Sequence, residues 1–432
     1  MPVPRMLLAG ACCALLGVSA ALAAAEEARP RLIRPAPELP ESLPWDLASL
    51  SQPPAVEWLD DTAPVRSLVF AGEPFRGRAT RVFAYVATPA SIGAERGAAA
   101  TSGSSWPGVV LVHGGGGTAF AEWVKLWASR GYAAIAMDLA GRRPDPKAPR
   151  KPAATRLPDG GPGQEHADKF DTIATPDVTD DWPYHAVANV IRAHSLLRTL
   201  PGVDPDRTAI TGISWGGYTT CIVASLDDRF RAAVPVYGCG HLRDNSCWLG
   251  DFVRLGTEHA SRWAERYDPA RYLPACRVPI FFVNGTNDFA YPLDSFMKSH
   301  ADVRHAKKNV RIEVDMPHGH EEGWAPPEIA AFIDAAVRGT PELPVIDTPV
   351  LDDTVARCRV MAGGPVAKAA IVFTTEPGPI NKLTWKTMPA EIEADGTLVA
   401  PRPPDDVRAF FFTATTPAGL VVSSPAVIAP AR

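Results

Sequence analysis

The stretch Gly212-Ile213-Ser214-Trp215-Gly216-Gly217 carries the pattern Gly-x-Ser-x-Gly, and the interpretation of the chain starts from it. Residues 207–211 before it form a short β-branched run that predicts a buried strand, and residues 218–226 after it predict a helix. Between a strand and a helix, this pattern is typical of a nucleophile elbow, a strained turn that exposes a serine hydroxyl. The alternative is an ordinary strand-to-helix connection in which Ser214 caps the helix. The context favours a serine nucleophile.

Apolar strands alternate with helices on both sides of this turn. The predicted strands are 108–112, 132–137, 208–212, 231–237, 279–283 and 310–315. The predicted helices are 119–129, 184–200, 218–226, 258–267, 291–305 and 327–337. Wholly apolar strands alternating with helices indicate a mainly parallel sheet covered on both faces, and an antiparallel pair, 65–70 with 78–88, precedes it. We therefore expect an α/β domain over residues 65–338, with its site at the carboxyl ends of the strands.

Three segments depart from this pattern. Residues 26–64 are rich in proline and predict an extended arm on the surface. Residues 141–183 form an insertion without periodicity that predicts a lid or binding loop, with a disordered excursion as the alternative. Residues 340–432 contain short β-rich runs between Pro and Gly, which predict an all-β, immunoglobulin-like sandwich packed on the α/β domain. Trp385 there is expected in the core, or else as the platform of a carbohydrate-binding module.

The composition of this 432-residue chain indicates where the protein acts and which partners are disfavoured. Residues 1–25 contain Arg5, an apolar run over 6–22 and small residues at 21–25, which predicts an export signal and a periplasmic or secreted protein. The run is rich in Ala and Gly, so a stable membrane anchor is disfavoured. A net charge of -5 without a long basic run argues against nucleic acid as a partner. The oligomeric state is left open.

The cysteines predict no metal site. Five follow the export signal, and they are Cys221, Cys239, Cys247, Cys276 and Cys358. A local disulfide between Cys239 and Cys247 is one possibility, and Cys221 is expected to be a buried apolar residue. No spacing of Cys and His suggests zinc, and we expect neither a metal nor an organic cofactor.

An acid and a base follow the elbow in the order that one group of serine hydrolases uses, namely Ser, then Asp or Glu, then His. The strand 279–283 leads into Asn284-Gly-Thr-Asn-Asp288, which would leave Asp288 just beyond the strand. Asp294 is disfavoured because it falls inside a predicted helix. The strand 310–315 leads into Met316-Pro-His-Gly-His320. We favour His320 as the base because Gly-His directly precedes the next helix, and His318 is the alternative base.

A glycine loop, His113-Gly-Gly-Gly-Gly117, follows the first apolar strand. Glycines there let backbone N–H groups point at an oxyanion, so the amide of Gly115 or Gly116 is expected to form an oxyanion hole with the amide of Trp215. A flexible glycine loop and a phosphate cradle are the alternatives, but the lysine that a phosphate loop needs is missing after the glycines.

These motifs together resemble the acetylxylan esterase, dienelactone hydrolase and prolyl oligopeptidase-like branch of the α/β-hydrolase superfamily. The resemblance rests on His113–Gly117, Gly212–Gly217, Gly285–Asp288 and Gly319-His320, and it extends over about two thirds of the chain. It implies Ser214 as nucleophile, Asp288 as acid and His320 as base. Dienelactone hydrolases have cysteine where this chain has Ser214, and residues 26–64 are too short for the β-propeller of the oligopeptidases, so an esterase is favoured.

The implied function is an exported serine esterase that acts on short-chain carboxylic esters, with acetyl esters of carbohydrates as one candidate substrate. A serine peptidase of the prolyl oligopeptidase-like type is the first alternative, and a non-catalytic, hydrolase-like binding protein is the second. Aromatic and His residues in predicted loops could border the cleft and face sugar rings, or could serve packing alone. They are Trp182, Tyr237, His241, Trp248 and Trp324.

Overall fold

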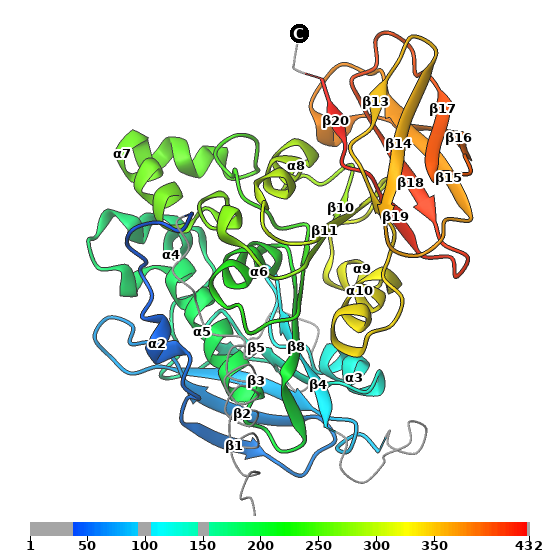
Figure 1. Ribbon diagram of the computed structural model, residues 1–432. Coiled ribbons are helices and arrows are strands. Elements are labelled where there is room, and N and C mark those ends of the chain that lie inside the picture. The colour runs from blue at the N-terminus through cyan, green and yellow to red at the C-terminus, as the bar shows by residue number, and fades with distance from the viewer. Residues whose placement is uncertain (1–37, 94–104, 146–154, 430–432) are drawn as a thin grey trace, which may run out of the picture.

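The computed structural model describes residues 38–93, 105–145 and 155–429, so the predicted export signal lies outside the described residues. A twisted sheet forms the centre of the molecule (Figure 1). Its strands, in spatial order, are β1 (Val56–Asp60), β2 (Arg66–Ala71), β3 (Arg81–Ala87), β5 (Ala133–Met137), β4 (Trp106–Val112), β8 (Val203–Ile213), β9 (Ala232–Val236), β10 (Ile280–Gly285) and β11 (Lys308–Glu313). The pairs from β1 to β5 are antiparallel and those from β5 to β11 are parallel. The predicted, mainly parallel sheet is confirmed.

Helices cover both faces of this sheet (Figure 1). On one face lie α5 (Trp182–Leu197), α6 (Trp215–Leu226) and α8 (Leu293–Asp302), and on the other lie α3 (Ala121–Ser129) and α10 (Pro327–Arg338). Strands β5, β9 and β10 are buried along their whole length. Because neither face of these strands meets water, their sequences are continuously apolar.

The segment before the sheet is more ordered than the sequence suggests. Residues 38–64 contain a short helix, α2 (Leu47–Leu50), and strand β1, which extends the sheet beside β2. Trp45 is buried, and its indole N–H donates to the carbonyl of Tyr184 at 2.9 Å. Most of this part is exposed, as a surface arm would be, but its pairing with β2 and the buried Trp45 give it an order that the sequence does not predict.

The insertion at 141–183 is folded over most of its described residues. It contains β6 (Arg142–Arg143), β7 (Thr155–Arg156), α4 (His166–Phe170), η2 (Asp171–Ala174) and η3 (Val178–Asp180). Phe170 is fully buried, and its ring lies 5.5 Å from that of Phe252 and 5.4 Å from that of Trp263. Both partners belong to α7 (Leu249–Tyr267), a helix that bends at Gly256. The insertion is thus packed onto a second excursion from the sheet.

The C-terminal region is β-rich and continues the edge of the sheet. Its strands are β12 (Val345–Ile346), β13 (Val350–Leu351), β14 (Val355–Ala362), β15 (Lys368–Thr374), β16 (Lys386–Ile392), β17 (Thr397–Pro401), β18 (Ala409–Thr415), β19 (Val421–Ser423) and β20 (Val427–Ile428). Strand β19 pairs with β11, and β16 pairs with both β15 and β17. An immunoglobulin-like arrangement stays a prediction. Trp385 is half-buried, with its ring 5.5 Å from that of Phe411.

The remaining short elements join these parts. They are η4 (Pro269–Arg271), η5 (Leu273–Ala275), α9 (His320–Trp324) and η6 (Ile380–Lys382). Cys239 and Cys247 are free thiols, so the suggested disulfide is not formed, and Cys221 is buried as expected. Within the described ranges, no helix has the length and apolar character needed to span a bilayer.

Candidate active site

The elbow at Ser214 is a strained turn held by close backbone packing. Ser214 lies between β8 and α6 with φ 58° and ψ -118°, a conformation that side-chain-bearing residues rarely adopt. Its N–H donates to the carbonyl of Val236 at 2.8 Å. A Cβ atom on Gly216 would lie 2.0 Å from the carbonyl oxygen of Val112, and one on Gly212 would lie 2.2 Å from that of Gly216. Only glycine fits these positions, as the motif predicts.

Ser214, His318 and Asp288 form one chain of hydrogen bonds. The hydroxyl of Ser214 lies 2.9 Å from His318 Nε2, and His318 Nδ1 lies 2.6 Å from Asp288 Oδ2. Asp288 is 1 % exposed, and its other oxygen accepts the backbone N–H groups of Ala290 and Tyr291 at 2.9 and 2.7 Å. A carboxylate held this way keeps Nδ1 protonated and leaves Nε2 free to accept the serine proton.

The preference for His320 over His318 is wrong in this geometry. His320 Nε2 accepts the backbone N–H of Gly114 at 3.0 Å, and its ring packs 4.9 Å from that of Phe120. Burial, with His113 and His318 nearby, lowers the pKa of His320 to about 4, so it is neutral. The chain turns at Asp315 with φ 54°, which brings His318 over Ser214 and places His320 at the start of α9, against the glycine loop.

Asp294, the other candidate for the acid, makes contacts away from the serine. It lies on α8, where its carboxylate accepts the side-chain amide of Asn245 at 3.1 Å. Asp288 therefore occupies the position that the sequence predicted for the acid.

The glycine loop lies directly against the nucleophile. A Cβ atom on Gly114 would be 2.9 Å from Cβ of Ser214, while Gly115 and Gly116 are exposed and Gly116 has φ 69°. His113 anchors the loop, since its Nδ1 donates to the carbonyl of Gly114 at 2.7 Å and its Nε2 accepts the N–H of Leu139 at 2.8 Å. Burial lowers the pKa of His113 to about 4, which fits this neutral tautomer.

Most of the aromatic residues that the sequence placed at the cleft serve packing. The ring of Tyr237 stacks 4.4 Å from that of His318, and its hydroxyl donates to the carbonyl of Pro317 at 2.7 Å. Trp182 and Trp248 lie 5.4 and 4.5 Å from the ring of Trp215. These contacts hold His318 and the elbow rather than offering open faces to a sugar.

Trp324 packs in the same way, with its ring 5.1 Å from that of Trp123. Phe289, which the sequence analysis did not single out, is 59 % exposed, and its ring lies 5.1 Å from that of His318. Because it is exposed and lies beside His318, Phe289 is the aromatic group there that a substrate can most readily reach. Its only signal in the sequence is its place next to Asp288.

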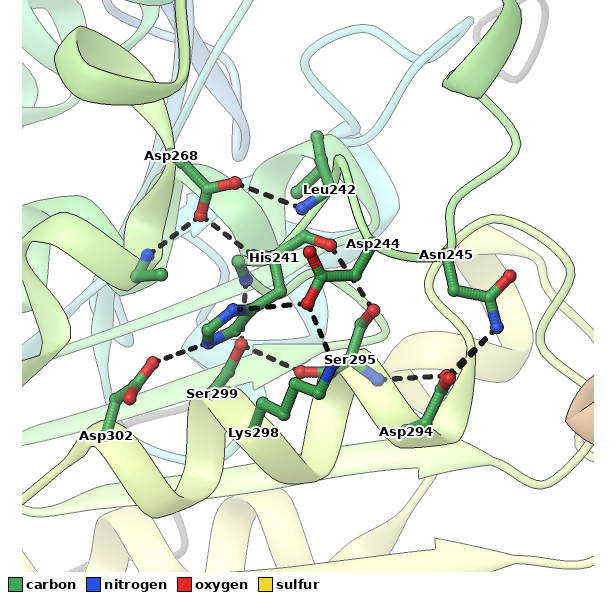
Figure 2. A network of polar contacts seen from close by, with 12 residues as sticks. His241, Leu242, Asp244, Asn245, Asp268, Asp294, Ser295, Lys298, Ser299 and Asp302 are labelled. Carbon is green, nitrogen blue, oxygen red and sulfur yellow. Dashed lines mark hydrogen bonds and ion pairs between the residues drawn. The ribbon is translucent and has the colours of Figure 1, made fainter. Parts of the chain in front are cut away.

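His241 belongs to a separate polar network (Figure 2). Its Nε2 lies 2.7 Å from Asp302 on α8, and its backbone N–H donates to Asp268 at 2.8 Å. Burial opposes protonation, but the hydrogen bond and charge of Asp302 outweigh it and raise the pKa of His241. This network ties the loop after β9 to α8. In the described part of the chain, no group of three or more Cys, His, Asp and Glu is arranged to hold a metal ion.

Two family models match overlapping parts of the α/β region. A model of the prolyl oligopeptidase family matches residues 170–330, and one of the acetyl xylan esterase family matches residues 83–248. The acetyl xylan esterase from Paenibacillus sp. R4 superposes with a TM-score of 0.52 and 22 % identity, over 73 % of this chain and 99 % of that one. Acetyl xylan esterase 1 from Thermoanaerobacterium sp. JW/SL YS485 gives 0.50 and 17 %, over 68 % of this chain and 95 % of that one. No curated protein matches by sequence.

At these identities the structural likeness concerns the fold. The strand order, the elbow on β8 and the two overlapping family matches agree with one another, and the chain has an α/β-hydrolase fold.

Proposed function

We propose that this protein is a serine esterase that hydrolyses short-chain carboxylic esters through an acyl-enzyme, and that it is exported to the periplasm or the medium. Acetyl esters of carbohydrates are the first substrates to test. The observation that carries the proposal is the chain of contacts from Ser214 through His318 to Asp288, at 2.9 and 2.6 Å.

The proposed reaction has two halves. Ser214 Oγ attacks the ester carbonyl carbon while its proton passes to His318 Nε2, and Asp288 stabilises the imidazolium that forms. The oxyanion accepts hydrogen bonds from the amide of Trp215 and from that of Gly115 or Gly116. His318 then gives its proton to the leaving alcohol, and the acyl group stays on Ser214.

In the second half, water attacks the acyl carbonyl carbon as His318 Nε2 takes a proton from the water. His318 then returns this proton to Ser214 Oγ as the bond between the acyl carbon and Oγ breaks, and the carboxylic acid leaves. Loss of one oxyanion donor costs about 3–4 kcal/mol of barrier in enzymes of this kind. The preference for esters is supported by the acetyl xylan esterase model over residues 83–248, which include the glycine loop and the elbow.

A serine peptidase is the second candidate, because the prolyl oligopeptidase model matches residues 170–330, which include Ser214, Asp288 and His318. The leaving group separates the two candidates. We expect hydrolysis of 4-nitrophenyl acetate and of acetylated xylo-oligosaccharides, decreasing with acyl chain length, without cleavage of peptide amides.

The serine dependence is tested with Ser214→Ala. Ser225→Ala is the matched control, since Ser225 lies on the same helix and donates to the carbonyl of Cys221 at 2.8 Å, within the helix. We expect a fluorophosphonate probe to label the wild type and Ser225→Ala, and to leave Ser214→Ala unlabelled. A folded wild type that takes no label and hydrolyses no ester would instead support the non-catalytic binding protein.

A further inference from the structure

A buried lysine lies beside the glycine loop. Lys169 comes from α4 in the insertion at 141–183 and is 6 % exposed. Its ammonium group lies over two indole rings, 4.7 Å from the centroid of Trp215 and 5.3 Å from that of Trp182. Cation–π contacts of this kind hold a positive charge in place without neutralising it.

The ammonium group is close to the glycine loop. A Cβ atom built on Gly115 would lie 3.7 Å from Lys169 Nζ and 3.0 Å from Cδ1 of Trp215. The neighbouring Gly114 lies against Ser214, where a Cβ would be 2.9 Å from Cβ of the serine. The positive charge of Lys169 is therefore next to both segments that would supply the oxyanion donors.

No carboxylate among the described residues pairs with this ammonium group. The nearest acids are committed elsewhere, because Glu165 pairs with Arg142 at 2.7 Å and Asp251 pairs with Arg254 at 2.8 Å. Asp251 also lies 2.9 Å from His166. A buried cation without a counter-ion is costly, so its retention needs a reason.

We propose that Lys169 is a specificity-determining residue that binds a carboxylate carried by the ester substrate, so that esters with a negative charge near the reacting carbonyl are preferred. This rests on the proposed esterase function and names its substrate class. The carboxylate can lie on the acyl side or on the alcohol side of the ester, and separate substrate pairs test the two sides.

The charge of Lys169 also gives the site a pH dependence. Burial lowers the pKa of Lys169 to about 8. Electrostatic interactions with Glu165 at the start of α4, with Cys247 just before α7 and with Asp251 on α7 act in the opposite direction. His113 also lies near it and is neutral, with a pKa of about 4. The preference for anionic esters should therefore be full at about pH 6–7, where the substrate carboxyl group is ionised, and should fall as the pH rises through about 8, since the ammonium group then loses its proton.

The test compares kcat/KM within matched pairs of esters. For the acyl side, 4-nitrophenyl hemisuccinate is compared with 4-nitrophenyl butyrate, and for the alcohol side, 4-acetoxybenzoate is compared with phenyl acetate. In Lys169→Met, the ratio of anionic to neutral substrate should fall about ten- to hundredfold for one pair, the range expected for a charge-assisted hydrogen bond. Lys169→Arg should keep most of the ratio. Lys298→Met removes a surface lysine of α8 that pairs with Asp244, and it should leave the ratio unchanged.

Two further measurements keep the inference separate from folding and from turnover. Thermal unfolding of each variant shows whether it is folded. Binding to Ser214→Ala is measured by calorimetry for both sides of the ester, with monomethyl succinate against methyl butyrate and 4-acetoxybenzoate against phenyl acetate. In one of the two pairs the anion should bind more tightly, and Lys169→Met in the same background should remove the difference.

The inference is overturned if folded Lys169→Met keeps both ratios within twofold, or if Ser214→Ala binds the anionic and the neutral ligand equally in both pairs. By contrast, a wild type that hydrolyses no ester at all refutes the proposed function, while the binding comparison still reports on the anion site.

Discussion

Separate replacement of the two histidines after β11 gives the sharpest test of the site. His318 contacts both Ser214 and Asp288, whereas His320 accepts the backbone N–H of Gly114 and packs against Phe120. The members of a triad act as a unit, so His318→Ala should lower kcat for 4-nitrophenyl acetate by about 10⁴-fold or more.

His320→Ala removes the acceptor of the hydrogen bond from the N–H of Gly114. A buried N–H group left without a partner costs about 1–3 kcal/mol, and if Gly114 shifts, the whole cost can appear in the barrier, which corresponds to about five- to hundredfold in rate. His320→Gln, which keeps an acceptor, should be affected less.

The assay is stopped-flow release of 4-nitrophenol, which reports the burst of acyl-enzyme and the steady rate together. His320→Ala should keep the burst, and His318→Ala should lose it. The reasoning is refuted if His320→Ala is as inactive as Ser214→Ala while His318→Ala still forms the acyl-enzyme.

Three further predictions concern packing, acid stability and substrate contact. Gly216→Ala should lower the free energy of unfolding by more than about 2 kcal/mol and abolish activity, because its Cβ would lie 2.0 Å from the carbonyl oxygen of Val112. Gly250→Ala, in α7 with no atom within 4 Å of its Cβ, should be neutral or stabilising by up to about 1 kcal/mol in urea unfolding. Burial lowers the pKa of His300 to about 3 from 6.5, so the unfolded state binds the extra proton between these values and stability falls as the pH falls. His300→Gln should reduce that slope by about 1.4 kcal/mol per pH unit near pH 5, and an unchanged slope would show that His300 is protonated in the folded protein. Phe289→Ala should raise KM for aryl and sugar esters about two- to tenfold, with a smaller effect on kcat, whereas an unchanged KM would exclude it from the binding surface.

The sequence alone determined those features that depend on local pattern. Most of the apolar strands and helices lie close to their predicted bounds, although α7 begins nine residues before the predicted helix 258–267 and β8 begins five residues before the predicted strand 208–212. The strands were predictable because a strand buried on both faces must be apolar throughout. Ser214 and Asp288 are in contact through a histidine because each directly follows a parallel strand, and parallel strands end at one edge of the sheet. The glycines of the elbow are equally local, since a Cβ atom on Gly212 or Gly216 would lie 2.2 or 2.0 Å from a backbone carbonyl oxygen.

Only the tertiary structure decided which histidine lies over Ser214. His318 and His320 are two residues apart in a turn, and their spacing does not specify which ring faces the serine. The burial of His320 against the glycine loop decides it, and this burial depends on residues about 200 positions away in sequence, as the contact of His320 with Gly114 illustrates.

The same holds for the other features that the sequence did not reveal. Strand β1 exists because it pairs with β2, and α4 exists because Phe170 packs on α7. Lys169 lies beside Gly115 because α4 is held there, although its own stretch has no period that would indicate a site. Local pattern thus determined the strands, the elbow and the kind of chemistry, while contacts between distant segments decided the base and the charge beside it.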